Sequence, residues 1–486
     1  MIKVLRLADM IFRRQGNFSR RIVHATISIA LRLFFRRIET DGVESVPLTE
    51  PIIFVLNHPN GLIDPALVFV ALPRRVSFLA KSTLFSIPFF GFMLRALETL
   101  PLYRRVDAPE NAAANVLLNQ RTFAACFKLL GQNRCIALFP EGISHNSTHL
   151  LPVKTGAARI ALGALTVGEN SLINNESGKI LETNLTLKSL KIVPVGLYYT
   201  SRTSFRSEAL LRFGEAFEVL PVAPDPVDGQ PPREAVHVLS EKIAAALKNV
   251  TLNVETGAEL EIVGRVEQLF SSVYESLNFR VSLSEELDLR RKFAEKFESQ
   301  QPDAKLLKNR LDDYDNRLRE LGVSPEHLSV SKHSLGFVYK HFLFRLALIL
   351  MLAPLVFVGA IVHLPAYLLC LLLSRLFRRH GVDDSGGSVK ILAALVLMPL
   401  TWIIIAAAFF WLTDWRFALI VFPVTILSGY TALRCLEELF DLRGWFKAIW
   451  VLFRRRSLFI RLLLERRTLH REIAAIVAQP IKDKIV

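Results

Sequence analysis

Short apolar runs alternate with amphipathic stretches between residues 51 and 250. A short apolar run bounded by turn residues is typical of a buried strand, and an apolar period of about 3.6 residues is typical of a helix. The pattern predicts strands at 52–56, 76–80, 135–139, 192–199 and 210–213, and helices at 109–130, 154–166 and 232–249. This alternation predicts an α/β layered domain with a mainly parallel sheet, whose sites tend to lie at the carboxyl ends of strands.

Three long apolar runs dominate the last third of the chain, at 346–373, 391–412 and 417–433. A helix needs roughly 20 apolar residues to cross a bilayer, so the second run is a clear candidate and the third is marginal. The first run is long enough for a tilted span, or for a bent re-entrant pair that hinges near Gly359.

Basic clusters beside these runs bear on topology. They comprise Arg375, Arg378 and Arg379 after the first run, and Arg454, Arg455, Arg456, Arg466 and Arg467 in the tail. Basic flanks stay on the cytoplasmic side, so both clusters are expected there. If the amino-terminal domain is cytoplasmic too, the first run returns to its own side, and the other two form a hairpin around residues 413–416.

Changes in composition along the chain predict five segments. Residues 1–40 alternate apolar groups with arginine pairs, which suits an amphipathic helix in the membrane interface; a basic helix packed on the core is the alternative. Residues 41–250 form the α/β domain, 251–340 a charged helical subdomain, 341–435 transmembrane or re-entrant helices, and 436–486 a basic amphipathic tail.

The composition of the 486 residues is that of a membrane protein with a basic surface: 51% are hydrophobic, 22% are charged, and the net charge is +15. Such a charge suits nucleic acid or an anionic bilayer, and the apolar last third favours the bilayer over nucleic acid. The four cysteines are scattered, which makes a disulfide framework or a zinc site unexpected. No apolar run near the start is followed by a small-residue cleavage site, so no secretory signal is expected.

The strongest local signal follows the first predicted strand directly and reads NHPNGLIDP, from Asn57 to Pro65. His58 comes where a parallel strand ends, turn-type residues follow it, and Asp64 resembles an N-cap before a proline at the first helical position. A continuous helix would put positions six apart on different faces, so the turn is what brings His58 and Asp64 together.

An imidazole can take a proton from an alcohol, while a carboxylate on its other nitrogen fixes the tautomer and stabilises the imidazolium. For an isolated pair the structural alternative is favoured, in which Asp64 caps a helix and His58 is a satisfied buried residue. Three further blocks in chain order reverse that preference: LPLYRR at 100–105, FPEGIS at 139–144 and VPVG at 193–196. Each block alone also suits solvated charge, a turn or a bulged edge strand.

The four blocks resemble, in order, those of the glycerophospholipid acyltransferase family. That family usually has four residues between its His and Asp, whereas five stand here, as in the subgroup of fungal-type glycerol-3-phosphate and dihydroxyacetone-phosphate acyltransferases and their bacterial relatives. The stretches FPEGISHNSTHLLPVKTG and VPVGLYYTSRTSFRSEALLRFGE, the segments 290–295 and 313–322, and the apolar C-terminal half are also similar to that subgroup. Ser147 and His149 depart from it, since Arg and Asp are usual there, which leaves the acceptor headgroup open.

The resemblance implies that His58 is the general base and that Asp64 orients it. It also implies that Arg104 contacts the acceptor's phosphate, a task that suits a guanidinium fork. The remaining substrate-binding residues that it implies are Glu141, Gly142, Ser144 and Pro194. Lys81, Arg202 and Arg206 are weaker candidates for phosphate or coenzyme A contacts, with surface charge as the alternative.

The implied reaction is direct attack of an acceptor hydroxyl on the carbonyl of an acyl-CoA or acyl-carrier-protein thioester, with no metal and no cofactor. The sequence has no Gly-x-Ser-x-Gly elbow, no His-Glu-x-x-His and no phosphate-loop signature, which disfavours hydrolase, metalloprotease and ATPase functions.

The leading hypothesis is an sn-1 acyltransferase of glycerol 3-phosphate, with dihydroxyacetone phosphate as a second acceptor. A lysophosphatidic acid acyltransferase that makes phosphatidic acid is the alternative within the class. A non-catalytic membrane lipid-binding scaffold is the alternative outside it. The catalytic domain is expected on the cytoplasmic face of either a bacterial inner membrane or the endoplasmic reticulum.

Overall fold

The computed structural model describes residues 2–4, 18–72, 74–86, 91–92, 94–95, 97–104, 112–145, 147–166, 172–174, 180–182, 187, 189–202, 204–226, 229–254, 260–266, 269, 282–299, 301–323, 335–376 and 386–478. They form two compact units, which are described separately. The first is Met1–Asn253 with Arg379–Ser388, and the second is Val254–Arg378 with Val389–Val486.

Nine described strands of the first unit form one sheet. They are β1 (Ile2–Val4), β2 (Arg37–Asp41), β3 (Ile52–Leu56), β4 (Val76–Lys81), β5 (Leu100–Leu102), β6 (Cys135–Leu138), β9 (Lys191–Tyr199), β10 (Glu208–Phe213) and β11 (Phe217–Glu218). Their order is β1-β2-β10-β9-β3-β6-β4-β5, and β11 pairs with β9. Strands β9, β3, β6, β4 and β5 are parallel, and β2 and β10 run against them. The predicted mainly parallel sheet is confirmed.

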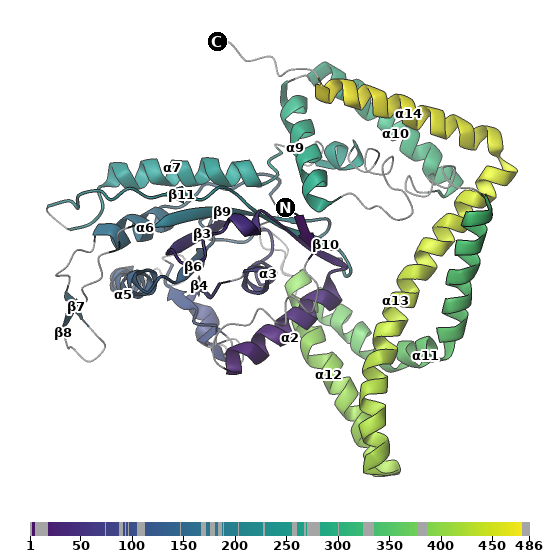
Figure 1. Ribbon diagram of the computed structural model, residues 1–486, viewed down its shortest axis with the longest axis horizontal. Coiled ribbons are helices and arrows are strands. Elements are labelled where there is room, and N and C mark those ends of the chain that lie inside the picture. The colour runs from purple at the N-terminus through teal and green to yellow at the C-terminus, as the bar shows by residue number, and fades with distance from the viewer. Residues whose placement is uncertain are drawn as a thin grey trace. The chain divides into compact units, whose positions relative to one another are not determined.

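Helices cover both faces of this sheet (Figure 1). They are α2 (Phe18–Phe34) and α3 (Ile63–Ala71) on one face, and α5 (Ala112–Gly131), α6 (Gly156–Thr166) and α7 (Arg233–Val250) on the other. Two short strands, β7 (Leu172–Asn174) and β8 (Ile180–Glu182), pair separately. The α/β layering predicted from the alternating pattern is therefore present.

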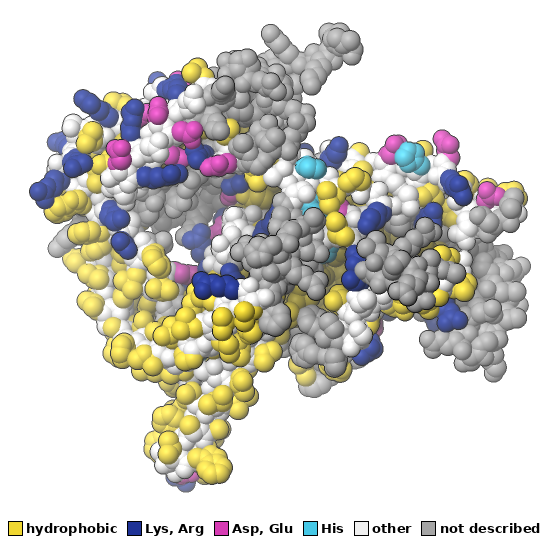
Figure 2. Space-filling model, turned by 180° about the vertical axis from the view of Figure 1, so that it is seen from behind, with side chains coloured by type: hydrophobic (Ala, Val, Ile, Leu, Met, Phe, Trp, Pro, Cys, Tyr) yellow, Lys and Arg dark blue, Asp and Glu magenta, His cyan; other side chains and the backbone are white. Residues whose placement is uncertain are grey.

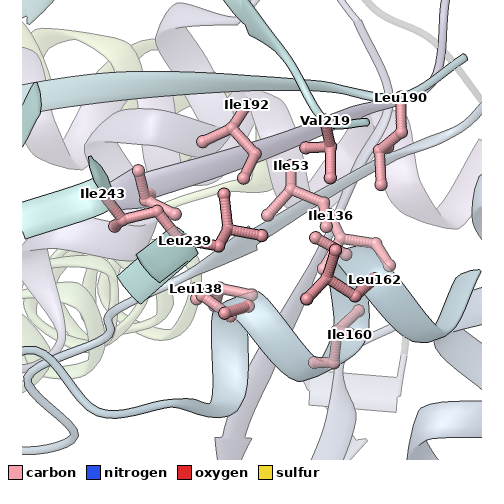
Figure 3. Packing of buried hydrophobic residues seen from close by; sticks show 14 of the residues in the cluster. Ile53, Ile136, Leu138, Ile160, Leu162, Leu190, Ile192, Val219, Leu239 and Ile243 are labelled. Carbon is pink, nitrogen blue, oxygen red and sulfur yellow. The ribbon is translucent and has the colours of Figure 1, made fainter. Parts of the chain in front are cut away.

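Strand β3 lies at the centre of the sheet and is buried along its whole length. Such a strand reads as a continuous apolar run because helices cover both of its faces. Ile53 points into the cluster shown in Figure 3, where it packs with Ile136 of β6, Ile192 of β9 and Ile243 of α7. This packing fixes the end of β3 in space, and the chain leaves the sheet there toward His58.

The chain crosses the sheet in both directions from β3. It passes through α3 to β4 and β5, returns through α5 to β6 beside β3, and then reaches β9 on the other side of β3. Because these strands are parallel, their carboxyl ends meet at one edge, where ligand sites of open α/β sheets lie. We call this the carboxyl edge.

Helix α2 turns a polar face toward the domain. The buried polar side chains on that face are Arg20, His24 and Ser28. The Arg20 guanidinium donates to the carbonyl oxygens of Leu97 at 3.2 Å and Val76 at 3.1 Å. Ile22 and Ile29, in contrast, are 50% and 44% exposed. The described part of segment 1–40 thus packs on the domain with polar residues in the first turns of α2 and with Leu31 and Phe34 in its last turn, while Ile22 and Ile29 stay outside.

The second unit contains a helical bundle and three long apolar helices. Its labelled helices are α9 (Leu283–Ser299), α10 (Gln301–Leu321), α11 (Leu335–Leu376), α12 (Gly386–Leu412), α13 (Trp415–Arg454) and α14 (Arg456–Ala478). Phe293 of α9, Tyr314 of α10 and Phe459 of α14 are fully buried in one core. The charged segment 251–340 and the tail 436–486 therefore share a single hydrophobic core.

The stretches Phe342–Leu376, Val389–Leu412 and Trp415–Arg454 are each long and apolar enough to cross a membrane. Figure 2 shows these helices as a nearly continuous hydrophobic surface. Only Thr413 and Asp414 separate α12 from α13, which agrees with the predicted hairpin. The first run lies within one continuous helix, α11, which is bent (Figure 1). The choice between a tilted span and a re-entrant pair stays a prediction.

Helices α11 and α13 approach each other closely at glycines. A Cβ added to Gly359 would lie 2.1 Å from the carbonyl oxygen of Ser428, and one added to Gly429 would meet the His363 ring. The His363 ring also donates from Nδ1 to the Gly359 carbonyl at 2.9 Å, and its Nε2 accepts from Trp402 of α12 at 2.9 Å. Small residues and satisfied polar groups of this kind hold helices together where lipid replaces water.

A Gly359→Ala substitution should weaken the α11–α13 contact, because the Ser428 carbonyl is backbone and cannot rotate away. We expect a loss of about 1–3 kcal/mol, as for other overpacked sites. Thermal unfolding of the purified protein in detergent measures it. Gly336→Ala is the matched control, since a Cβ there meets open space in the same helix. Equal stability of the two variants would contradict the proposed close contact.

Candidate active site

His58 and Asp64 form a hydrogen-bonded pair at the carboxyl edge. His58 follows β3 by two positions, and its Nδ1 lies 2.8 Å from Oδ2 of Asp64. Asp64 has no exposed surface, whereas the His58 side chain is 15% exposed. The turn between them brings the two side chains together, as the sequence predicts.

The predicted N-cap role of Asp64 is wrong. Helix α3 begins at Ile63 with Leu62 as its N-cap, so Asp64 lies inside the first turn and Pro65 follows it there. Oδ2 of Asp64 instead pairs with His58 and accepts from the Asn60 backbone N–H at 2.7 Å. Asp64 therefore pairs with His58 and does not cap α3.

Tyr199, the last residue of β9, supplies a further donor to Asp64. Its hydroxyl donates to Oδ1 at 2.5 Å. Burial, and then the negative charge of Asp64, raise the pKa of Tyr199 well above its ordinary value. The phenol therefore stays protonated and continues to donate through the neutral and mildly alkaline pH range.

This arrangement leaves His58 able to act as a base. An ionised carboxylate only accepts hydrogen bonds, so the Nδ1 that faces it carries the proton and Nε2 keeps its lone pair. Within the described part of the chain Nε2 makes no hydrogen bond. A base of this kind takes the proton from a hydroxyl group that approaches Nε2.

Glu141 fixes the backbone of His58. It follows β6 in the turn Phe139–Gly142 and is buried. Its Oε1 accepts from the His58 backbone N–H at 2.8 Å, and its Oε2 accepts from the Leu151 N–H at 2.9 Å and pairs with the His145 ring. The His145 backbone N–H donates in turn to the His58 carbonyl at 3.1 Å.

Two more contacts hold the His58 turn on the sheet. The Phe139 ring stacks on the His58 imidazole with 4.0 Å between ring centroids. The side-chain amide of Asn57 both donates to and accepts from the backbone of Leu197 in β9, at 3.1 and 2.7 Å. The imidazole is thus fixed from both neighbouring strands.

Basic side chains gather around the Phe139–Gly142 turn. Arg104, two residues after β5, donates from Nη1 to the Gly142 carbonyl at 2.8 Å. Arg202, after β9, donates to the carbonyls of His145 at 2.9 Å and Ser147 at 3.5 Å. The carboxyl edge therefore has a positive character near the base.

A cleft of about 600 Å³ opens beside β5. Its lining includes Ser82, Thr83, Phe85, Thr99, Pro101 and Tyr103. Ligand sites commonly enclose about 300–1,000 Å³. Tyr103 directly precedes Arg104, so the cleft extends to the carboxyl edge.

Family models match two parts of the chain. The acyltransferase model matches residues 37–197, which contain the His58–Asp64 pair, and the glycerol-3-phosphate acyltransferase 2 C-terminal domain matches residues 266–480. Both models describe acyltransferase domains, and the chain is similar to glycerol-3-phosphate acyltransferases over these two ranges. The predicted resemblance is confirmed.

Curated relatives agree with the family models. Glycerol-3-phosphate O-acyltransferase 2 of Saccharomyces cerevisiae is 27% identical over 59% of this chain and 37% of its own length. The chloroplastic 1-acyl-sn-glycerol-3-phosphate acyltransferase of Brassica napus is 25% identical over 31% of this chain and 40% of its own. The match thus spans about two fifths or less of either relative.

A solved structure is also similar, that of the 1-acyl-sn-glycerophosphate acyltransferase of Thermotoga maritima. It is 17% identical, covers 50% of this chain and 85% of its own, and has a TM-score of 0.33. At that score the likeness adds nothing to the sheet topology described above.

The structure brings together most of the site residues that the resemblance implies. Those that lie around the His58 turn are His58, Asp64, Arg104, Glu141, Gly142 and Ser144; a Cβ on Gly61 would lie 3.4 Å from the Ser144 hydroxyl. Lys81 ends β4 at the same edge of the sheet. Arg105 and the Arg13–Arg14 pair lie outside the described residues.

Pro194 has a clear structural setting in β9. Its carbonyl accepts from the Gly214 N–H at 2.8 Å, between the end of β10 and the start of β11. A strand residue turns its N–H and C=O to the same side, so the missing N–H of the proline faces this strand break. The predicted role of Pro194 in substrate binding stays a prediction.

Arg206 belongs to the end of α2 rather than to a phosphate site. Its Nη1 contacts three carbonyl oxygens there, those of Arg32, Leu33 and Phe35. A guanidinium that binds the last carbonyls of a helix also interacts favourably with the helix dipole.

Sequence reasoning missed three functional contacts: Tyr199 on Asp64, the Asn60 N–H on Asp64, and His145 on Glu141. Tyr199 and Asp64 are 135 residues apart and meet only through the pairing of β3 with β9. No local pattern predicts that contact. The four-residue spacing of Glu141 and His145 was visible, but the segment between them is not helical.

Tyr199→Phe should change stability at alkaline pH. The folded-state pKa of Tyr199 is raised, so its contribution to stability is present below the unfolded value of about 10 and is lost as pH rises beyond it. Wild type should lose up to about 1.4 kcal/mol per pH unit above 10 from this group, and the variant should lack that part. Denaturant unfolding between pH 8 and 11 measures it.

Tyr103→Phe is the matched control, because its side chain lies outside the apolar helices, is half-buried, and its hydroxyl makes no hydrogen bond within the described residues. It should follow the wild-type curve. If the Tyr199 variant also followed that curve, the buried phenol would not be coupled to folding in the way described.

Proposed function

We propose that this protein is a membrane-bound O-acyltransferase that moves a fatty acyl group from an acyl thioester to the sn-1 hydroxyl of glycerol 3-phosphate. The observation that carries the proposal is the His58–Asp64 pair, whose Nε2 is left as an acceptor at the carboxyl edge of an acyltransferase-type domain. The intact pair argues against a scaffold that only binds lipid.

In the proposed mechanism the acceptor hydroxyl donates to Nε2 of His58 and attacks the thioester carbonyl as its proton moves to the imidazole. Asp64 stabilises the imidazolium that forms, and the Tyr199 and Asn60 donors hold the carboxylate in place. Collapse of the tetrahedral intermediate expels the thiolate, which receives the proton from His58. No covalent enzyme intermediate, metal or cofactor takes part.

Glycerol 3-phosphate is proposed as the first acceptor because similarity extends into the second unit. The C-terminal model that matches residues 266–480 is that of a glycerol-3-phosphate acyltransferase. The match to the Brassica napus 1-acyl-sn-glycerol-3-phosphate acyltransferase covers only 31% of this chain. Dihydroxyacetone phosphate is a second proposed acceptor, and lysophosphatidic acid is the alternative.

The protein is membrane-associated, and we assign its catalytic domain to the cytoplasmic face of the membrane. The three long apolar helices support the first point, and the basic clusters that follow α11 and α13 support the second. The exposed apolar face of α2, with Ile22 and Ile29, suits contact with the lipid surface.

His58→Ala should lower kcat with every acceptor by about 10²–10⁴-fold, because it removes the proton acceptor. Transfer of a radiolabelled acyl group from acyl-CoA in purified, detergent-solubilised enzyme measures it. His237→Ala is the matched control, since His237 is 73% exposed on α7 and pairs only with Glu241 among the described residues. Undiminished transfer by the His58 variant would rule out the mechanism.

The acceptor is tested separately by comparing kcat/KM for glycerol 3-phosphate, dihydroxyacetone phosphate and lysophosphatidic acid on the wild-type enzyme. We expect glycerol 3-phosphate to be preferred. Activity with lysophosphatidic acid alone would support the alternative function and exclude the first. The same assay with acyl-carrier-protein thioesters in place of acyl-CoA identifies the donor.

A further inference from the structure

Gly142 leaves room for a lysine that no sequence block assigns to the site. Its φ of +74° lies in the left-handed region, and a Cβ placed on it would stand 2.5 Å from Nζ of Lys154. The same Cβ would lie 3.1 Å from the Cδ and Cε atoms of that lysine. The Lys154 side chain therefore lies across Gly142 and uses the space that the missing side chain leaves.

Lys154 is anchored to the active-site turn by its backbone. Its N–H donates to the carbonyl of Pro140 at 2.8 Å, one residue before Glu141. Glu141 in turn holds the His58 N–H at 2.8 Å. The start of the lysine side chain is thus tied to the same turn that positions the general base.

Lys154 differs from the other cations named at this edge. Arg202 donates hydrogen bonds to the backbone carbonyls of His145 and Ser147, and Arg104 donates from Nη1 to the carbonyl of Gly142. The Lys154 side chain is exposed, and within the described residues its ammonium makes no hydrogen bond or ion pair. An ammonium is a compact, strongly hydrated charge that binds phosphate well.

Arg104 and Lys154 both lie against Gly142. Arg104 Nη1 lies 2.8 Å from the Gly142 carbonyl oxygen, and Lys154 Nζ lies 2.5 Å from where a Gly142 Cβ would stand. Standard backbone dimensions then put the two groups no more than about 9 Å apart. Two cations this close repel each other. A phosphate that contacts both would replace that repulsion with attraction.

From this geometry we infer that Lys154 binds the phosphate of the acyl acceptor together with Arg104, across the bare backbone of Gly142. The inference rests on the proposed function for the identity of the acceptor. It adds a specificity residue, because a phosphorylated acceptor gains from two cations and a neutral alcohol gains from neither. The phosphates of coenzyme A share this chemistry, so the test separates the two sources.

Steady-state kinetics of the full-length enzyme with Lys154→Gln is the first test. We expect KM for glycerol 3-phosphate to rise at least tenfold, kcat to stay within about threefold, and KM for acyl-CoA to stay unchanged. Lys154→Arg should restore most of the acceptor affinity. Lys248→Gln, an equal loss of charge at an exposed position of α7, should match wild type.

Two kinetic outcomes overturn the inference. An unchanged KM for glycerol 3-phosphate would show that Lys154 takes no part in acceptor binding. A rise in KM for acyl-CoA alone would move the contact to the donor. Gly142→Ala adds a check on geometry, because its Cβ displaces the ammonium. In the double variant Gly142→Ala/Lys154→Gln, KM for the acceptor should be no higher than in Lys154→Gln alone.

Chemical protection tests the site without turnover. Lysines of the wild-type enzyme are acetylated at trace levels, and the labelling of Lys154 and Lys248 is compared by mass spectrometry. Glycerol 3-phosphate should slow labelling of Lys154 at least threefold and leave Lys248 unchanged, whereas coenzyme A should protect neither. Protection of Lys154 by coenzyme A alone, or by neither ligand, contradicts the inference. If glycerol 3-phosphate protected Lys154 but the enzyme transferred no acyl group, the proposed phosphate site would stand and the proposed function would be rejected.

Discussion

The buried charge of Asp64 is the constraint on which the carboxyl edge depends. An ionised carboxylate removed from water is stable only when hydrogen-bond donors surround it. Here they come from the His58 ring, the Asn60 backbone and the Tyr199 hydroxyl. One side chain therefore holds the turn after β3, the first turn of α3 and the end of β9 in one arrangement. A shift of β9 by one residue along β3 would remove the tyrosine from its place.

Sequence patterns predicted those structural features that depend on residues close together in the chain. The alternation of apolar runs predicted the parallel sheet, and the turn chemistry after β3 predicted that His58 and Asp64 would meet. The same local rules failed at the start of α3, because a carboxylate that suits an N-cap was taken by a partner outside the helix. Tyr199 was out of reach of any local rule, since only the pairing of β3 with β9 brings it to Asp64.

The second unit shows a similar limit on a larger scale. The charged segment 251–340 and the tail 436–486 each read as amphipathic helices, and neither pattern identifies the partner of its apolar face. In the structure each covers the other, with Phe293 and Phe459 in the shared core and ion pairs such as Arg317–Glu465, at 3.0 Å, between α10 and α14. The apolar helices α11 and α12 and the start of α13 lie between the two segments in the chain. The bundle therefore closes a loop that contains the membrane helices.

Asn57 has a consequence for how the catalytic turn leaves the sheet. A parallel strand normally continues or ends with backbone groups that need new partners. The Asn57 side chain has the same donor and acceptor groups as a peptide unit, and Leu197 bonds to it as it would to another residue of β3. The hydrogen-bonded ladder thus runs one step further than the backbone does. The main chain is free to turn outward at His58, and β9 keeps its hydrogen-bond partners where the backbone of β3 has left the sheet.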